Sequence, residues 1–283
     1  MKRRKIEEEI FKILMIISTI LIFLTLALIL FIVIVRGVKS MNLAMISEIP
    51  KGGYYLGKEG GILNAILGSL YLAGGATFLA LLFSLPVALY LNIHAKRHSR
   101  LVAISRFSFD VLWGVPSIVY GAFGFTLMLF FGLRSSLLGG IVTVALLVLP
   151  IMTRAMDEVM RMVPQELLDA SYALGATKLE TALKVLTRQA LGGILTAVLI
   201  AFGRGIGDAA SVIFTAGFTD SLPTSLLRPA ATLPLAIFFQ LGTPVHEVQD
   251  RAYAAAFILT VIILAVSIIS RMLTSRFTRH VIK

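Results

Sequence analysis

The sequence predicts an all-α polytopic membrane protein with about six transmembrane helices. Apolar residues make up 58% of the 283 residues, and the mean hydropathy is +0.92. Soluble domains are typically about 45–50% apolar. Six stretches are long enough to cross a hydrocarbon layer of roughly 30 Å as helices, and too uniformly apolar for barrel strands, which alternate over about ten residues. The predicted spans are residues 10–35, 62–91, 107–132, 136–153, 191–216 and 252–272.

The first span, residues 10–35, is expected to stay as a membrane anchor. No small-residue cleavage site follows it, and it is too long for the core of a signal peptide. The loop after it contains Pro50 and the pairs Gly52-Gly53 and Gly60-Gly61, which predict irregular structure. We therefore expect residues 1–61 to form an N-terminal helix and loop, and residues 62–283 to form a five-span unit.

Spans two and three contain residues that shape membrane helices. Span two includes Pro86, which kinks such helices. Span three is expected to begin near Arg106 and to carry an Arg106–Asp110 surface pair at its start. Trp113 and Tyr120 are expected to anchor this span at an interface or to pack in the core.

A charged, amphipathic segment of about 37 residues, 154–190, separates spans four and five. Loops between spans are usually short, so a long helical insert in water indicates a docking role. We expect a short helix ending near Leu174, a left-handed turn at Gly175, and a second helix from about Thr177 to Arg188. A knob of this shape can sit in a groove on another protein.

Span five carries two ionisable residues, Arg204 and Asp208. Such residues are costly inside a membrane and usually functional. At i and i+4 they would share one helix face, about 6 Å apart along the axis. The guanidinium offers a fork of donors suited to phosphate oxygens and keeps its charge, while the carboxylate can neutralise it when no substrate is bound. The alternative is a permanent ion pair that only holds helices together. Gly203, Gly205 and Gly207 permit close helix approach or local unwinding.

A proline-rich segment, residues 217–251, follows span five. Within it, residues 230–240 are apolar but too few to span the membrane, which fits an interfacial or re-entrant helix. This helix is either a contact for a substrate-delivery protein or a lid packed on its own bundle.

The distribution of basic residues predicts the orientation. Eighteen of the 26 Lys and Arg lie before or at the start of span one, between spans two and three, between spans four and five, or at the end of span six and beyond it. Seven lie on the other side, and Arg204 is inside span five. The positive-inside rule therefore places both termini and the 154–190 segment in the cytoplasm. The same rule accounts for the net charge of +11, so the basic excess does not indicate a nucleic-acid-binding protein.

The sequence also excludes several chemistries. The chain has no cysteine, and its four histidines are scattered, so neither disulfides nor a metal site are expected. It has neither a Gly-x-x-x-x-Gly-Lys-Ser/Thr phosphate loop nor a recognisable catalytic set. We therefore expect a protein that is not an enzyme and has no cofactor of its own.

Five segments carry a family resemblance. Asp169, Ala170, Ser171 and Gly175 match the coupling motif of ABC importer permeases, in which an acidic residue precedes two small residues and the second lies four positions before a glycine. Over roughly residues 62–272 the chain resembles the PstA-type permeases of phosphate ABC importers. The matching strings are Trp-Gly-Val-Pro-Ser-Ile-Val-Tyr-Gly at 113–121, Arg-Gly-Ile-Gly-Asp-Ala at 204–209, Phe-Thr-Ala-Gly at 214–217 and Thr-Leu-Pro-Leu at 232–235.

The chain departs from that family's pattern at four places. Asp208 and Ala209 stand where Glu and Thr are usual, and Asp169 stands where the coupling motif usually has Glu. Thr187-Arg188 replaces a Leu-Pro pair. The shorter acids keep the charge but reach less far.

The resemblance implies a type I ABC importer permease fold and a path for inorganic phosphate through the plasma membrane. It implies as partners a second, homologous permease, a dimer of ATP-binding subunits that hold ATP and Mg²⁺, and an external phosphate-binding protein. Arg204 and Asp208 would line the path, and the coupling motif would dock the ATPase. One alternative is the same machine for molybdate, sulfate or a phosphonate; another is a channel or scaffold that uses the 154–190 segment as a docking platform.

Overall fold

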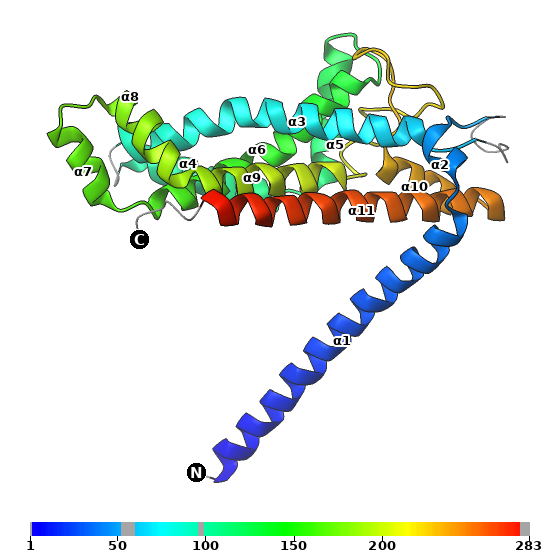
Figure 1. The fold of residues 1–283 in the computed structure, drawn as a ribbon, viewed down its shortest axis with the longest axis horizontal. Helices are drawn as coiled ribbons and strands as arrows, with labels where there is room; N and C mark the ends of the chain where they lie inside the picture. Colours follow the sequence, from blue (N-terminus) through cyan, green and yellow to red (C-terminus); the bar gives the residue numbers. More distant parts are fainter. Residues whose placement is uncertain (1, 52–59, 96–98, 278–283) are drawn as a thin grey trace.

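The structure, a computed structural model, describes residues 2–51, 60–95 and 99–277. Gly52-Gly53 of the first loop, Lys96, Arg97 and His98 of the basic turn, and the tail residues Arg279, His280 and Lys283 lie outside these ranges. The described chain is an elongated helical bundle with α7 and α8 at one end and α2 and α10 at the other (Figure 1). We refer to these as the α7 end and the α10 end.

The helices, in chain order, are α1 (Lys2–Ser40), α2 (Leu43–Ser47), α3 (Leu63–Leu89), α4 (Arg100–Gly114), α5 (Ser117–Phe130), α6 (Leu137–Arg161), α7 (Gln165–Ala173), α8 (Lys178–Glu180), α9 (Thr187–Ile206), α10 (Leu233–Leu241) and α11 (His246–Phe277). Two π-helical turns, η1 (Tyr90–His94) and η2 (Thr181–Leu186), extend α3 and join α8 to α9. Within the described residues, five helices are long and apolar enough to span a membrane, or six if α4 and α5 form one broken span. The prediction of about six spans is therefore confirmed.

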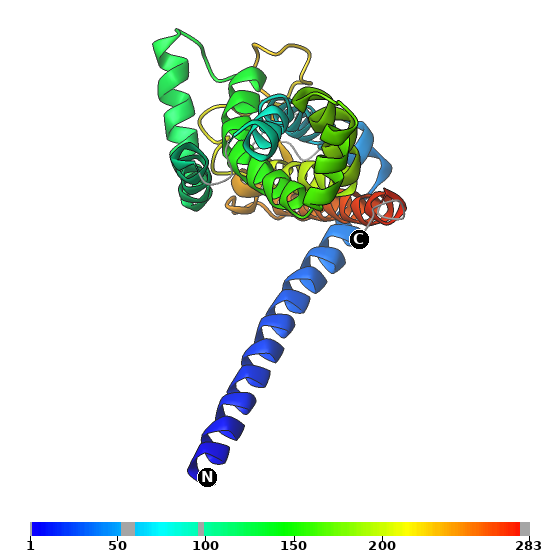
Figure 2. The same ribbon diagram turned by 90° about the vertical axis from the view of Figure 1, so that its left-hand side faces the viewer.

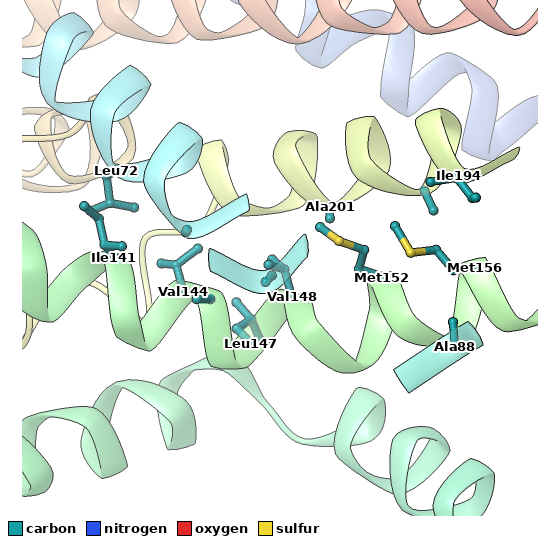
Figure 3. Close-up of a cluster of buried hydrophobic side chains, with 14 of the residues drawn as sticks. Leu72, Ala88, Ile141, Val144, Leu147, Val148, Met152, Met156, Ile194 and Ala201 are labelled. Atoms are coloured by element: carbon teal, nitrogen blue, oxygen red, sulfur yellow. The ribbon is translucent and has the colours of Figure 1, made fainter. Parts of the chain in front are cut away.

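The core lies where α3, α6 and α9 pack lengthwise. Val144, Val148 and Met152 of α6 have no exposed surface, and Met152 lies beside Ala201 of α9 (Figure 3). The facing residues of α3 are small, for example the fully buried Ala76. Small residues let the helix backbones approach closely, which suits association in lipid, where burying apolar surface supplies no driving force.

The insert between spans four and five is shorter than predicted. α6 continues to Arg161, because Met156 and Met160 prolong its apolar stripe and are buried, with 0% and 2% exposure. The predicted second helix does not end at Arg188 but runs on through η2 into α9. The protruding part is therefore limited to residues 162–186, which we call the coupling knob.

The predicted span three is a bent pair rather than one helix. α4 begins at Arg100, before the predicted start at Arg106, and Ser99 caps it. α4 and α5 meet at 99° around Val115 and Pro116. Pro116 lacks a backbone N–H, and Val115 before it is extended, which interrupts the helix between α4 and α5.

Helix α1 diverges from the bundle (Figures 1 and 2). Its most apolar membrane-length window has no buried residue. Only its C-terminal part packs on α11, where Arg36 lies over the ring of Tyr253 at 4.9 Å and Gly37 packs against Phe257. Most of α1 thus presents apolar side chains to its surroundings.

The short helix predicted at residues 230–240 is present as α10 (Leu233–Leu241), which begins three residues later than predicted. α10 starts after Thr232, whose hydroxyl accepts a hydrogen bond from Leu235 N. Leu233, Leu235 and Ala236 are at most 1% exposed; Leu233 and Ala236 belong to a cluster of buried residues at the α10 end, and Leu235 packs in the main core. The structure therefore favours the lid interpretation for this helix, although Phe238 remains 59% exposed.

Candidate functional site

The turn of the coupling knob is built as predicted. α7 ends in a Schellman motif, in which Gly175 N donates to Tyr172 O at 2.9 Å and Ala176 N donates to Ser171 O at 3.2 Å. Gly175 has φ +83°, a left-handed conformation that opposes side chains with a Cβ. The sequence signal was local, since a glycine two residues after a helical stretch is the usual residue for this motif.

The second half of the knob is fixed by side-chain hydrogen bonds. Thr177 and Glu180 form a reciprocal capping box at the start of α8. The hydroxyl of Ser171 lies 2.9 Å from that of Thr181, which ties α7 to η2. Of the predicted motif residues, Ser171 and Gly175 therefore hold the shape of the knob.

The other two motif residues, Asp169 and Ala170, lie on its exposed surface. Asp169 accepts one weak hydrogen bond, from Gln165 at 3.3 Å. Exposed apolar side chains lie on the same knob: Met162 (81%), Leu174 (89%), Leu179 (60%) and Leu183 (54%). Several large apolar side chains exposed on one short segment outside the predicted spans agree with a protein contact surface.

Arg204 and Asp208 are close but do not share a helix. α9 ends at Ile206 with Gly207 as its C-cap, so the prediction of one continuous helical face is wrong for Asp208. Arg204 Nη2 lies 3.8 Å from Asp208 Oδ1, a long contact. The predicted pair therefore exists as a loose ion pair across a helix end.

Glycine and a competing hydrogen bond explain why the helix ends there. Asp208 Oδ2 accepts from Ser211 N at 2.8 Å and so caps the following turn. Gly205 packs against Val144 of α6, whereas a Cβ at Gly203 would meet nothing within 4 Å. The predicted close approach is thus found at Gly205, whereas Gly203 stays helical and Gly207 lies where the helix ends.

The geometry leaves Arg204 with unused donor capacity. Its side chain is 52% exposed, whereas that of Asp208 is 5% exposed. A guanidinium has five N–H donors in a planar fork. The cavity of about 560 Å³ beside Gly207 is apolar, and Arg204 does not line it. An oxyanion held by Arg204 would therefore lie on the outer surface of this chain.

Sequence reasoning missed a buried charge at the α7 end. Asp157 of α6 has no exposed surface and is held by Arg106, Arg154 and Asn92. Asp110, which was expected to pair with Arg106, instead binds Arg154 Nε at 2.9 Å. That expectation was wrong because α4 packs against α6, which brings tertiary partners closer than the helical neighbour. The sequence did carry a signal for this cluster, because Arg154, Asp157 and Glu158 at i, i+3 and i+4 lie on one face of a helix.

A cavity of about 580 Å³ lies beside this cluster and beneath the knob. Arg106 and Asn92 form part of its wall, together with Tyr172 of α7 and Leu186 of η2. The buried charge cluster and the coupling knob therefore border the same space.

Comparisons with known proteins agree with this architecture. Residues 80–283 match the family described as the binding-protein-dependent transport system inner membrane component. The chain is 32% identical over 248 residues to the phosphate transport system permease protein PstA of Yersinia pestis, covering 88% of this chain and 83% of that protein. It is 31% identical over 256 residues to PstA of Haemophilus influenzae, with 90% and 89% covered. It is 34% identical over 223 residues to PstA 1 of Mycobacterium tuberculosis, with 78% and 73% covered.

Solved structures share the fold. An inward-facing MetNI methionine ABC transporter superposes with a TM-score of 0.62 at 19% identity, over 77% of this chain and 96% of that one. An amino acid ABC transporter superposes with a TM-score of 0.53 at 21% identity, over 77% and 92%. The predicted type I importer permease fold is therefore confirmed. The chain belongs to the family of inner-membrane components of binding-protein-dependent transport systems.

Proposed function

We propose that this chain is a permease subunit of an ATP-driven importer of inorganic phosphate. The observation that carries the proposal is 31–34% identity to phosphate transport permeases over most of the chain. The half-exposed guanidinium of Arg204 agrees with it, because Arg binds phosphate oxygens through paired hydrogen bonds. ATP and Mg²⁺ belong to a partner subunit, and this chain supplies the path.

The coupling knob is the proposed contact with the ATP-binding subunits. Asp169 and Ala170 lie on its surface beside the exposed Leu174. The capping box and the Schellman motif hold this surface in one shape. A preformed knob loses less conformational entropy on docking than a flexible loop would.

A second permease is proposed to complete the substrate path. Arg204 faces outward from this chain, so a path that contains it needs a wall from another subunit. Asp208 is proposed to hold Arg204 in place between substrates. An external phosphate-binding protein would deliver the ion at the α10 end, and docking and ATP-driven closure would open the path to each side in turn.

The orientation implied by the basic residues is tested by labelling. The chain has no cysteine, so single cysteines can be introduced at Ser40, Thr219 and Thr177. With both termini in the cytoplasm, an impermeant maleimide applied to cells should label the first two and not the third. The reverse pattern would exclude a cytoplasmic knob.

Uptake into proteoliposomes tests the substrate. The full transporter is reconstituted with its binding protein, and ³²P-phosphate uptake is measured with ATP on the ATPase side. We expect ATP-dependent uptake that excess sulfate, molybdate and phosphonate do not suppress. Suppression by one of these would favour another oxyanion, and uptake without ATP would favour a channel.

A further inference from the structure

The bent pair α4–α5 is attached to the bundle in an unusual way. α4 has fifteen residues, and Val102 is its one buried residue. Two ion pairs attach it to α6: Arg106 binds Asp157, and Asp110 binds Arg154. With so little buried apolar surface on α4, these charged contacts are a large part of its attachment.

Asp157 is the centre of this attachment. Arg106 donates to both of its carboxylate oxygens, through Nε at 2.8 Å and Nη2 at 2.9 Å. Asn92 of η1 donates at 2.8 Å, and Arg154 Nη1 donates at 3.3 Å. A carboxylate has about four acceptor sites, so these four bonds satisfy it. Asp157 thus joins α6, α4 and the π-helical end of α3 at one point.

The other arm of the bent pair meets the turn after Arg204. A Cβ added at Gly121 of α5 would lie 2.9 Å from the carbonyl oxygens of Ala210 and Ser211, which is closer than a Cβ normally approaches. Three residues further on, Gly124 packs tightly against Thr143 of α6. The backbone of α5 is therefore in direct contact with the Asp208–Ser211 turn.

The bend itself is braced. Tyr120 Oη, on α5, donates to Leu112 O, on α4, at 2.9 Å. Pro116 fixes its own φ and restricts the residue before it. A hydrogen bond across a restricted corner lets the two arms move as one body.

We propose that α4–α5 is a bent lever that links movement of the knob-bearing end of α6 to the Asp208–Ser211 turn. Asp157 is the positioning residue that fixes the lever to α6. It lies four residues before Arg161, where α6 ends and the knob begins. A displacement of the knob by an ATP-binding subunit would move Asp157, and α5 would shift the turn that orients Asp208. This role rests on the proposed function, because it assumes that an ATPase displaces the knob.

The attachment is tested first by distance measurements that involve no substrate. In the cysteine-free chain, nitroxide pairs are placed at Ile104 on α4 and Ile268 on α11, and, as a control, at Phe83 on α3 and Ile268; all three sites are exposed. In Asp157→Asn we expect the first distance distribution to broaden and the second to stay as in wild type. Two outcomes would overturn the proposal. If neither distribution changes, α4 is held in place without Asp157. If both distributions broaden, Asp157 supports the whole bundle rather than α4 alone.

The coupling is tested in the reconstituted transporter by the number of ions transported per ATP hydrolysed. Asp157→Asn and Arg106→Gln should lower this ratio about tenfold, within the range for residues that carry coupling. The control is Glu158→Gln, which alters a 52% exposed carboxylate bound to Arg154 and should leave the ratio unchanged. An unchanged ratio in Asp157→Asn would overturn the lever.

Tyr120→Phe provides a second, milder variant. It removes only the hydroxyl that braces the bend, so assembly should be normal, and the ratio should fall about twofold to threefold. If Asp157→Asn does not assemble, a wild-type ratio in Tyr120→Phe overturns the proposal. If the wild-type complex carries an oxyanion other than phosphate, the proposed substrate fails, while the distance measurements and the ratio for that ion still test the lever.

Discussion

Two carboxylates of this chain, Asp157 near the α7 end and Asp208 after α9, are both buried and both lie near arginines, yet their environments differ. Asp157 accepts four hydrogen bonds of 2.8–3.3 Å from three residues. Asp208 accepts one from Ser211 and meets Arg204 at 3.8 Å. The arginine that binds Asp157 twice, Arg106, is 19% exposed, whereas Arg204 is 52% exposed.

The difference separates a structural charge from one available for binding. A buried charge is tolerated when its acceptors are satisfied, and removing a partner then exposes the full cost of desolvation. The Asp157 cluster meets that condition within one chain. Arg204 keeps N–H donors that an oxyanion can use. One oxygen of Asp208 already accepts a hydrogen bond from Ser211 N, and the other lies 3.8 Å from the Arg204 guanidinium.

The largest expected effect is on stability, at Asp157. Asp157→Ala leaves the part-buried Arg106 without its carboxylate and removes one of the two acceptors of Asn92, so we expect a loss of about 3–5 kcal/mol in the free energy of unfolding. Denaturant titration in detergent, followed by circular dichroism, measures it. Glu158→Ala, at a half-exposed site, should cost less than about 1 kcal/mol. Equal losses in the two variants would mean that the cluster is no more structural than a surface pair.

The next effect is on transport, at Arg204. Arg204→Gln should lower phosphate uptake on the order of 100-fold, as expected for losing charge-assisted hydrogen bonds to the ion. Its free energy of unfolding should change by less than about 1 kcal/mol, because the guanidinium is half exposed. Arg204→Lys keeps the charge but loses the planar fork, so its uptake should be intermediate.

A charge swap distinguishes binding from a permanent ion pair at the same site. Arg204→Asp combined with Asp208→Arg keeps one cation and one anion but moves the cation across the helix end. We expect normal assembly and abolished uptake. Near-normal uptake would show that the pair only holds the chain together and would remove the contrast with Asp157.

A smaller effect on stability is expected at two exposed glycines, one in the coupling knob and one in the turn after α5. Gly175 has φ +83° and Gly132 has φ +66°, and a Cβ at either would meet nothing within 4 Å. Valine at each should therefore cost a similar amount, about 1–2 kcal/mol of local strain. Only Gly175→Val should stop transport, because it reshapes the coupling knob, and it should do so with normal membrane insertion.

The control for Gly175→Val is a second substitution of the same glycine. Gly175→Asn should retain most uptake, since Asn tolerates the left-handed region. Normal co-purification of the ATP-binding subunits with full uptake in Gly175→Val would exclude a coupling role for the turn.

The smallest effect is a pH dependence at Asp220, in the loop before α10. Its Oδ1 is buried and accepts no hydrogen bond from the described residues. Burial raises the pKa of Asp220 above its ordinary value of 3.8, and the positive charge of Arg251 partly opposes this. A raised folded-state pKa favours the protonated form, so this contribution to stability is complete below pH 3.8 and is lost as the pH rises through the folded-state pKa.

Asp220→Asn cannot ionise, so it does not lose this stability as the pH rises. We expect the variant to be more stable than wild type at pH 7, by less than about 0.5 kcal/mol, and equally stable near pH 4. Unfolding titrations at the two pH values measure this. A variant that is less stable at pH 7 would show that attraction to Arg251 outweighs desolvation.

Local patterns in the sequence were sufficient for much of the architecture. Long apolar runs predicted the membrane helices, since a lone helix satisfies its backbone groups in lipid without help from distant residues. The Leu174–Gly175–Thr177 sequence predicted the turn of the knob, because C-caps and N-caps depend on only a few neighbouring residues. The short helix at 230–240 was predicted from length and hydropathy alone.

The partners of the charged side chains were decided by packing between helices. Arg106 binds Asp157 rather than Asp110 because α4 lies against α6, a contact between residues 51 positions apart. The 99° bend at Pro116 and the end of α9 at Ile206 have local causes, the proline and the hydrogen bond from Ser211 N to Asp208, although the apolar runs that contain them predicted continuous spans. Hydrophobic length and turn chemistry are properties of short segments and can be read from the chain, whereas the satisfaction of a buried charge depends on groups that only the folded bundle brings together.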